Sequence, residues 1–330
     1  MKNFAYAQPR SEAEAVQLLS PRRGETVVLA GGTDLVGLMK RMVVQPELVV
    51  NIAEIPSLQR IESYLDGGLR VGAAVSLDAF LASRPADRYP AVKQAIQGIS
   101  SLQLQAQGTV VGELLRRPNC WYFRNGQGLL ANRGQLVVQG DNRYHAILGN
   151  RGAAKFVNAS RLAPALISLG AQIRVIGPGS EDERMLPLEA LYQAPRDDSE
   201  QEFTLEPNQL VSHLFIPADK GRLSAAYEVR QGEGPDHPLA AAAATMEVVD
   251  GRVRAARIVL GQVAPTPWIS HEAAQSLIGK SITAETAEQA GYEAVASAMP
   301  LSQNEYKIQL AKVAVKRAIL RAAGLETGGF

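Results

Sequence analysis

The stretch from Val27 to Lys40 reads V-V-L-A-G-G-T-D-L-V-G-L-M-K, and it decides the fold of the N-terminal part of the chain. Its β-branched apolar start is typical of a buried strand. Gly31-Gly32 then leaves the backbone without side chains at the point where the chain must turn. Thr33 or Asp34 is placed to cap a following helix, whose apolar residues recur at intervals of three and four. The stretch therefore predicts a strand, a glycine turn and a helix start.

This strand-turn-helix unit indicates an anion site. The free N–H groups of a helix N-terminus and of a glycine turn converge on one position and carry partial positive charge. A phosphate or pyrophosphate would suit that position. An ordinary tight turn explains the two glycines equally well, because the stretch matches neither the spaced-glycine dinucleotide fingerprint nor the phosphate loop ending in Gly-Lys-Ser/Thr.

Length and net charge limit the classes of protein to which this chain can belong. The chain has 330 residues, enough for two domains, and its formal net charge is +1. This balance provides no charge field that favours nucleic acid or a membrane surface. No run approaches the roughly 20 apolar residues of a membrane helix, and the start lacks the apolar core of a signal peptide. We therefore expect a cytoplasmic protein with no membrane span and no nucleic-acid partner.

The cysteine and histidine content argues against metal chemistry on this chain. Cys120 is the single cysteine, which excludes an internal disulfide framework, a cysteine zinc site and a cysteine-ligated iron–sulfur cluster within the chain. His145 has no second ligand nearby in the sequence, and Asp236-His237 is more typical of a turn than of a catalytic pair. We predict neither a metal site nor a catalytic residue.

The elements indicate an α+β fold with a first domain over residues 1–217. Strands at 4–6 and 47–52 and a helix capped near Ser11 would join the Val27 strand in a small unit with parallel strands, ending near residue 56. The second subdomain, 57–217, would contain the remaining elements. These are a hairpin within 58–75, helices opening at 76–78 and covering 91–99 and 162–171, and strands at 172–176, 186–188 and 211–216.

In two stretches of the first domain the apolar residues do not recur at a regular spacing. Gly108 to Glu113 places glycines around a β-branched run, which brings backbone close to a ligand or, as we favour, to a neighbouring strand. Residues 116–158 are rich in Arg, Asn and Gly and are expected to form one long loop, of a kind that is usually functional. Its run Trp121 to Phe123 predicts either an anchor for a partner or a small cluster that holds the loop down.

A linker at 217–222 leads to a second domain over residues 222–330. Strands at 224–229, 240–249 and 253–260 are expected there, the last two joined by the hairpin signal Asp250-Gly251. Three helical stretches, at 271–277, 284–298 and 304–323, would cover one face of the sheet. The prediction is a three-stranded antiparallel sheet with a helix bundle.

Taken together over nearly the whole chain, these stretches resemble the FAD-binding medium subunit of the molybdenum hydroxylases, the family of carbon monoxide dehydrogenase, xanthine dehydrogenase and hydroxybenzoyl-coenzyme A reductase. Ala30 to Leu35 matches the first flavin motif of that family, and Gly108 to Glu113 resembles the second. Residues 162–166 with 169–171 match the following segment, and residues 238–244, 251–253 and 264–267 resemble the C-terminal domain. The ordered set is more specific than any single motif.

The resemblance implies a two-subdomain FAD-binding domain of the molybdopterin dehydrogenase type and a C-terminal domain of the CO dehydrogenase flavoprotein type. The chain would relay electrons between a 2Fe–2S small subunit and an external carrier. It would assemble with that subunit and a molybdenum-cofactor large subunit as a dimer of heterotrimers. The residues implied to bind FAD are Leu29, Ala30, Gly31, Gly32, Thr33, Asp34, Leu35, Gly108, Thr109, Gly112, Glu113 and Leu162.

Three positions depart from the family pattern. Val111 and Glu113 stand where the second motif typically has glycine and asparagine. A side chain at 111 would crowd the cofactor, and a carboxylate at 113 would weaken diphosphate binding unless it bonds a ribose or an amide. Arg161 replaces an aspartate that would contact the adenosine end. Moreover, the loop after the second motif resembles that of relatives with an additional iron–sulfur cluster, which Cys120 alone cannot hold.

These departures support an alternative function, that of a structural or docking subunit of the same complex with a lost or weakened flavin site. A third possibility is a stand-alone flavin reductase acting on a nucleotide sugar. It requires a proton donor over the flavin, and the C-terminal half of the sequence offers no candidate. For the leading function, the loop around Trp121 to Phe123 is a candidate docking surface for the iron–sulfur subunit.

Overall fold

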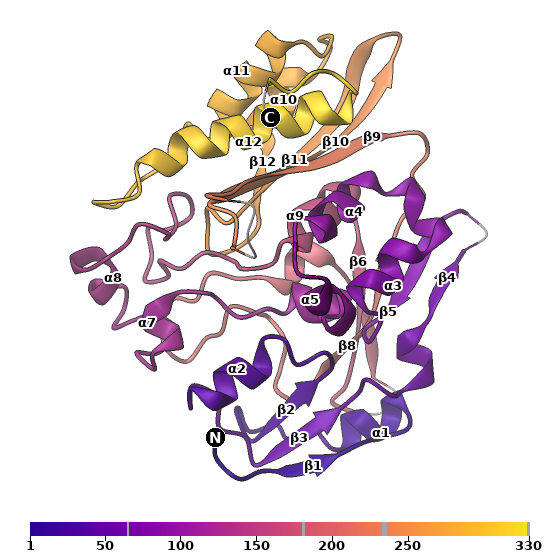
Figure 1. Ribbon diagram of the computed structural model, residues 1–330, viewed down its shortest axis with the longest axis vertical. Coiled ribbons are helices and arrows are strands. Elements are labelled where there is room, and N and C mark those ends of the chain that lie inside the picture. Colours follow the sequence, from indigo (N-terminus) through magenta and orange to yellow (C-terminus); the bar gives the residue numbers. More distant parts are fainter. Residues whose placement is uncertain (65, 180–181, 233–235, 329–330) are drawn as a thin grey trace.

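The computed structural model describes residues 1–64, 66–179, 182–232 and 236–328, and these residues form an α+β protein with three sheets (Figure 1). The sheets follow one another along the chain. The first two belong to the part of the chain that carries the glycine motifs, and the third lies at the C-terminal end with the last helices packed on it. The α+β class predicted from the sequence is confirmed.

The first sheet is the small parallel unit that the sequence predicts. Its three strands lie in the order β1-β3-β2, with every pair parallel. Ser11 caps the first helix, because its hydroxyl accepts a hydrogen bond from the Glu14 N–H at 3.1 Å. The elements are β1 (Ala5–Ala7), α1 (Glu12–Gln17), β2 (Thr26–Leu29), α2 (Leu35–Lys40) and β3 (Leu48–Asn51).

The second sheet has five strands, all antiparallel, in the order β4-β5-β8-β6-β7. Its strands are β4 (Ile61–Ser63), β5 (Leu69–Gly72), β6 (Gln172–Ile176), β7 (Glu183–Pro187) and β8 (Leu210–Ile216). The accompanying helices are η1 (Pro56–Gln59), α3 (Leu77–Ala82), η2 (Arg84–Arg88), α4 (Pro90–Gln97), α5 (Leu102–Gln107), α6 (Val110–Leu114), α9 (Leu162–Leu169) and η3 (Leu188–Leu191). Every residue of α9 is buried, which explains its unbroken apolar sequence.

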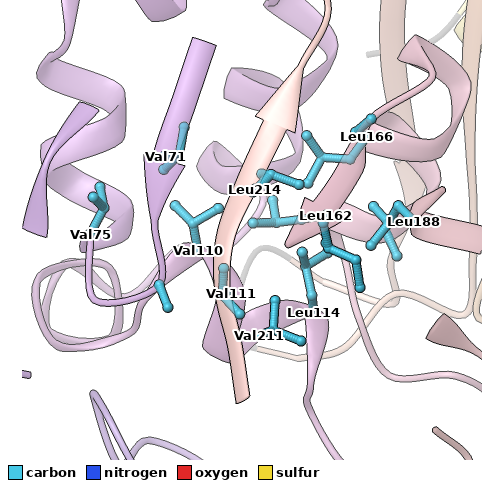
Figure 2. Packing of buried hydrophobic residues seen from close by; sticks show 14 of the residues in the cluster. Val71, Val75, Val110, Val111, Leu114, Leu162, Leu166, Leu188, Val211 and Leu214 are labelled. Carbon is cyan, nitrogen blue, oxygen red and sulfur yellow. The ribbon is translucent and has the colours of Figure 1, made fainter. Parts of the chain in front are cut away.

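A core of branched apolar side chains joins this sheet to its helices. Figure 2 shows Leu214 of β8 beside Leu162 and Leu166 of α9, with Val71 of β5 and Val110 of α6 in the same apolar cluster. Burial of this kind contributes roughly 1.5–3 kcal/mol for each large aliphatic side chain. The core fixes where α6 begins and therefore where the second glycine motif lies.

The segment 116–158 is more structured than the single loop expected from the sequence. It contains two short helices, α7 (Trp121–Arg124) and α8 (Gln135–Gln139). It also enters the C-terminal core, where the N–H groups of Ile147 and Leu148 both donate to the Val263 carbonyl, at 2.9 and 3.0 Å. Helices this short span little more than one turn, so they leave no periodic pattern in the sequence.

The third sheet is antiparallel, with the order β12-β11-β10-β9. It has four strands rather than the predicted three, because β12 is too short to show an alternating pattern. Helices α10, α11 and α12 cover one face of it (Figure 1). The elements are β9 (Leu223–Val229), β10 (Ala240–Val249), β11 (Arg252–Gly261), β12 (Trp268–Ser270), α10 (His271–Leu277), α11 (Ala284–Ala294) and α12 (Tyr306–Ala322).

Both faces of this sheet are buried. Ala242 and Ala244 of β10 pack under the C-terminal helices, whereas Ala243 belongs to the core around α9. Alternate residues of a strand point to opposite faces, so β10 serves two cores, and its run of small residues lets helices approach from both sides. No helix in the described part of the chain is long and apolar enough to cross a membrane.

Candidate cofactor-binding site

A cavity of about 320 Å³ opens between the glycine turn that follows β2 and the start of α6. The turn forms one wall, α6 and the residues after it form the second, and the approach to β8 forms the third. Eight of the residues implied by the family resemblance line this cavity: Ala30, Gly31, Gly32, Thr33, Asp34, Leu35, Thr109 and Gly112. Motifs that lie far apart in the sequence therefore meet at one place.

The turn needs glycine because the second motif crosses it. A Cβ atom on Gly31 would lie 1.9 Å from the Gln107 carbonyl oxygen and 3.1 Å from the Gly108 Cα atom. Gly32 has a φ angle of +71°, in the left-handed region that favours glycine. The close approach expected at these glycines is thus an approach of backbone to backbone. Gly108 supports the wall of the cavity without lining it.

The backbone of the turn presents unpaired donors. The N–H groups of residues 31 to 35 donate no hydrogen bond to any acceptor in the described part of the chain. The next N–H, that of Val36, donates to the Gly32 carbonyl at 3.1 Å, so the helical pattern begins only there. Consecutive unpaired N–H groups at a helix start are the donor set that a phosphate or diphosphate requires. These residues fit the diphosphate of a dinucleotide cofactor.

Asp34 does not cap α2, although the sequence allowed that interpretation. It lies at the N-cap position, but its side chain makes no capping hydrogen bond. Its carboxylate accepts from the Arg117 N–H at 3.0 Å and pairs with Arg124 at 2.7 Å. Long-range partners have replaced the local one, and they neutralise a negative charge that would otherwise oppose an anion in the turn.

Arg117 adds positive charge to the same wall, a role that no sequence signal indicated. It lines the cavity, pairs with Glu202, and stacks on Phe123 with 4.9 Å between its guanidinium carbon and the ring centre. The approach to β8, which forms the third wall, was also missed. This wall consists of Leu205, Glu206, Gln209, Leu210 and Val211. Only the pairing of β8 inside the second sheet brings these residues to the turn.

Glu113, one of the departures from the family pattern, has its partners outside the cavity. Glu113 does not line the cavity, and its side chain is only 7 % exposed. Its carboxylate accepts from the Arg161 N–H at 3.2 Å and lies 3.4 Å from Arg116. The amide partner that the sequence analysis required for a carboxylate at this position is therefore present. The structure thus places Glu113 beside this cavity and not in its lining.

Arg161 occupies a buried position at the junction with the C-terminal domain. Its guanidinium donates to the Gly98 carbonyl at 2.7 Å and to the Asp236 carbonyl, and its Nε lies 3.5 Å from Glu228. Burial lowers the pKa of Arg161 and raises the pKa of the Glu228 carboxyl. The arginine thus ties two parts of the chain together and does not line the cavity.

The other residues singled out from the sequence lie in the core or at the end of a strand. Val111 is 2 % exposed and packs beside Val211 in the core, while also forming part of the cavity wall (Figure 2). Leu162 is fully buried in the same core, and Leu29 ends β2 without lining the cavity. Leu162 is therefore a residue that positions α6 and not one that lines the cavity.

The aromatic run of segment 116–158 holds the segment down. The Trp121 ring lies 5.5 Å from the Tyr144 ring and 5.6 Å from the His145 ring. Phe123 is 5 % exposed, and a contribution of the loop around it to docking of a partner stays a prediction. The described residues contain no group of three His, Cys, Asp or Glu side chains placed to hold a metal ion.

The chain matches two family models in sequence. Residues 2–219 match the FAD binding domain in molybdopterin dehydrogenase, and residues 225–322 match the CO dehydrogenase flavoprotein C-terminal domain. The chain belongs to this family of FAD-binding oxidoreductase subunits. FAD is the cofactor of the family, and the cavity described above has the donors that its diphosphate needs. The family resemblance noted from the motifs is confirmed.

Relatives in this family align over almost their full lengths. The aldehyde oxidoreductase FAD-binding subunit PaoB of Escherichia coli is 31 % identical over 318 residues, covering 94 % of this chain and 96 % of that protein. The carbon monoxide dehydrogenase medium chain of Afipia carboxidovorans is 28 % identical, covering 97 % and 96 %. Carbon monoxide dehydrogenase of Hydrogenophaga pseudoflava has the same fold, with a TM-score of 0.77 at 24 % identity and 98 % of both chains covered.

Proposed function

We propose that this chain relays electrons through FAD between an iron–sulfur subunit and an external carrier. The observation that carries the proposal is the run of unpaired N–H groups at residues 31 to 35, facing the second motif across one cavity. In this arrangement the turn holds the cofactor diphosphate, and the start of α6 with Thr109 and Gly112 lines the path of the rest of the cofactor. FAD supplies the redox chemistry, and the chain supplies binding, orientation and charge.

The partners we propose are a molybdenum-cofactor large subunit and a 2Fe–2S small subunit, assembled as a dimer of heterotrimers. Support comes from the family, whose members include the medium chains of carbon monoxide dehydrogenases. We also propose the division into an FAD-binding domain over 1–217 and a C-terminal domain over 222–330. The cytoplasmic location remains a prediction from the sequence.

A docking subunit without flavin was the alternative, and its evidence was Val111, Glu113 and Arg161. Each now has another explanation: Val111 packs in the core, Glu113 bonds the Arg161 amide, and the Arg161 guanidinium bonds the Gly98 and Asp236 carbonyls. None of the three places a new charge in the turn. We therefore do not carry the alternative forward as a second function.

The first test is the FAD content of the chain purified with its partner subunits. Chromophore released by denaturation should be FAD at close to one per chain, and reduction of the complex by substrate should bleach its absorption band. A colourless complex that assembles and takes up no added FAD would contradict the proposal.

A second test uses the charge balance at Asp34. Arg124→Gln removes the partner of this carboxylate and should weaken FAD binding, because an unneutralised charge would face the diphosphate. Adding Asp34→Asn should restore the affinity. If the double variant binds FAD as weakly as the single one, Arg124 acts only through its hydrogen bonds to the Arg117 and Pro118 carbonyls, and the diphosphate lies elsewhere.

A further inference from the structure

A second cavity, of about 330 Å³, lies on the other side of the segment that carries Arg116 to Arg124. It is enclosed by residues of segment 116–158, by the stretch before β10 and by the start of α12. Its apolar and aromatic lining includes Trp121, Tyr144, Val157, Pro238 and Leu239. None of these residues belongs to the glycine-turn cavity, so the two cavities are separate.

Four residues that line this second cavity carry buried nitrogen atoms without a hydrogen-bond partner among the described residues. They are Asn119 (Nδ2), His145 (Nδ1), His237 (Nδ1) and Gln262 (Nε2). Gln262 is 3 % exposed, and His145 is 2 % exposed. A buried polar atom that is left unpaired costs about 1–3 kcal/mol, so four such nitrogen atoms around one space favour a ligand that pairs with them.

Hydrogen-bond geometry assigns donors at two of these positions. A guanidinium can only donate, so the His237 Nε2 that lies 3.0 Å from an Arg116 nitrogen must accept, and the proton of the neutral ring is on Nδ1. The Asn119 side-chain oxygen accepts from Arg124 at 3.3 Å, which leaves its NH2 group free to donate. Burial and the neighbouring Arg116 lower the pKa of His237 to about 3, so this ring is neutral near pH 7.

Lys307, a charged residue in the lining of this cavity, has all its partners within the protein. Lys307 donates to the carbonyls of Tyr144, His145 and Gln262 at 3.3, 3.1 and 2.7 Å. Its three N–H donors are thereby used, and no salt bridge to a carboxylate is required of a ligand. What the lining offers is therefore neutral N–H donors around an aromatic and apolar space. Its complement is a flat, uncharged ring that carries carbonyl oxygens.

The two cavities are connected through one side chain. Arg124 pairs with Asp34, which lines the glycine-turn cavity, and donates to Asn119, which lines the second cavity. A ring bound in the second cavity would therefore lie next to the segment that separates it from the proposed cofactor site. This adjacency matters because the function proposed above requires an external electron carrier.

We propose that the second cavity is a binding site for a planar carbonyl-bearing ring of the quinone class. Asn119, His237 and Gln262 would donate hydrogen bonds to the ring carbonyls, while Trp121 and Leu239 would contact its faces and edge. This inference rests on the proposed function, since it names the class of carrier that a flavin-containing relay subunit would meet. The other source of the same chemistry is the ring of the chain's own FAD, and the experiment separates the two.

Binding is measured on the FAD-loaded full chain with duroquinone, a fully substituted quinone to which the Cys120 thiol cannot add. The chain has two tryptophans, so Trp268→Phe leaves Trp121 in the cavity as the only reporter. Saturable quenching of the Trp121 emission is the expected result. Gln262→Met keeps the length of the side chain but removes its donor, and it should weaken binding about 5-fold.

Gln139→Met is the matched control, because this exposed residue of α8 lies outside the cavity, and it should leave the affinity unchanged. Val157→Phe fills the space and should abolish quenching, with the circular dichroism spectrum preserved. Unsaturable quenching, or equal affinity in the wild type, Gln262→Met and Val157→Phe, would overturn the inference. Quenching seen only after FAD removal would overturn it as well, since the cavity would then belong to the flavin ring. FAD content, assayed separately, reports whether the proposed function itself fails.

Discussion

The glycine turn and segment 116–158 are ordered by different means. The turn is shaped within a few residues, by Gly31, Gly32 and the strand and helix on either side. The segment is ordered by partners more than 100 positions away: Asn304 donates to the His145 and Ala146 carbonyls, and Asn142 donates to Ser302. Local order leaves a signature in the sequence, whereas order imposed from a distance does not.

The two proposed sites differ in the same way, in whether residues close in the chain or far apart in it shape them. The cofactor cavity has one wall that is encoded locally, and that wall was predicted residue by residue. The second cavity is lined by residues from four separate parts of the chain and has no motif. Its detection depended on buried polar atoms, which only the tertiary structure makes visible.

The largest loss of stability should come from adding a methyl group to the glycine turn. Gly31→Ala places a Cβ where the Gln107 carbonyl lies, 1.9 Å away, so the two motifs must separate. We expect the free energy of unfolding to fall by about 3 kcal/mol, with loss of bound FAD. Gly37→Ala, in the exposed part of α2 with no heavy atom within 4 Å of the added Cβ, is the control and should stabilise by about 0.5–1 kcal/mol. Urea unfolding measures both, and equal effects would contradict the close approach.

The second-largest loss of stability should come from removing a side chain that bonds segment 116–158 from far along the chain. Asn304→Ala removes one donor from the buried carbonyls of His145 and Ala146, which keep Lys307 and Asn150, and removes the acceptor of the Leu301 N–H. The variant should cost about 1–2 kcal/mol. Limited proteolysis should then cut within residues 116–158 while the FAD content stays unchanged. Gln303→Ala alters the neighbouring exposed residue and should behave like the wild type. Cleavage that begins in the glycine turn would show that the two regions are not ordered independently.

Acid should act through buried histidines, among them His145 of segment 116–158 and His237 beside the second cavity. Burial lowers the pKa of His145 to about 4 and that of His237 to about 3, against 6.5 in an unfolded chain. Between pH 6.5 and 4 the unfolded state takes up protons that the folded state does not, so stability is full above pH 6.5 and falls below it. The loss is up to about 1.4 kcal/mol per pH unit for each ring. His145→Gln with His237→Gln should reduce this dependence in denaturant titrations, with the remainder coming from buried His213, whereas exposed His271→Gln should retain all of it.

The smallest effect should come from the exposed ion pair of the segment. Arg143 bonds Asp141 with both side chains largely in solvent, where water and salt screen the attraction. Arg143→Ala should leave the unfolding midpoint and the proteolysis pattern unchanged within error. A measurable loss would mean that local contacts contribute to the order of this segment, against the comparison drawn above.

The sequence by itself determined the α+β class, the family, the cofactor and one wall of its cavity. It could do so because strand alternation, helical spacing and the conformational demands of glycine act between residues that are close in the chain. The same local reasoning placed the Asp250-Gly251 hairpin and the amphipathic C-terminal helix correctly.

Only the tertiary structure decided which polar side chains meet. It paired Asp34 with Arg124 instead of with its own helix, directed Glu113 to the Arg161 amide, and added β12 to the third sheet. It also enclosed the second cavity. Each of these depends on contacts between residues far apart in sequence. Their partners are fixed by the packing of the cores and leave no periodic pattern along the chain.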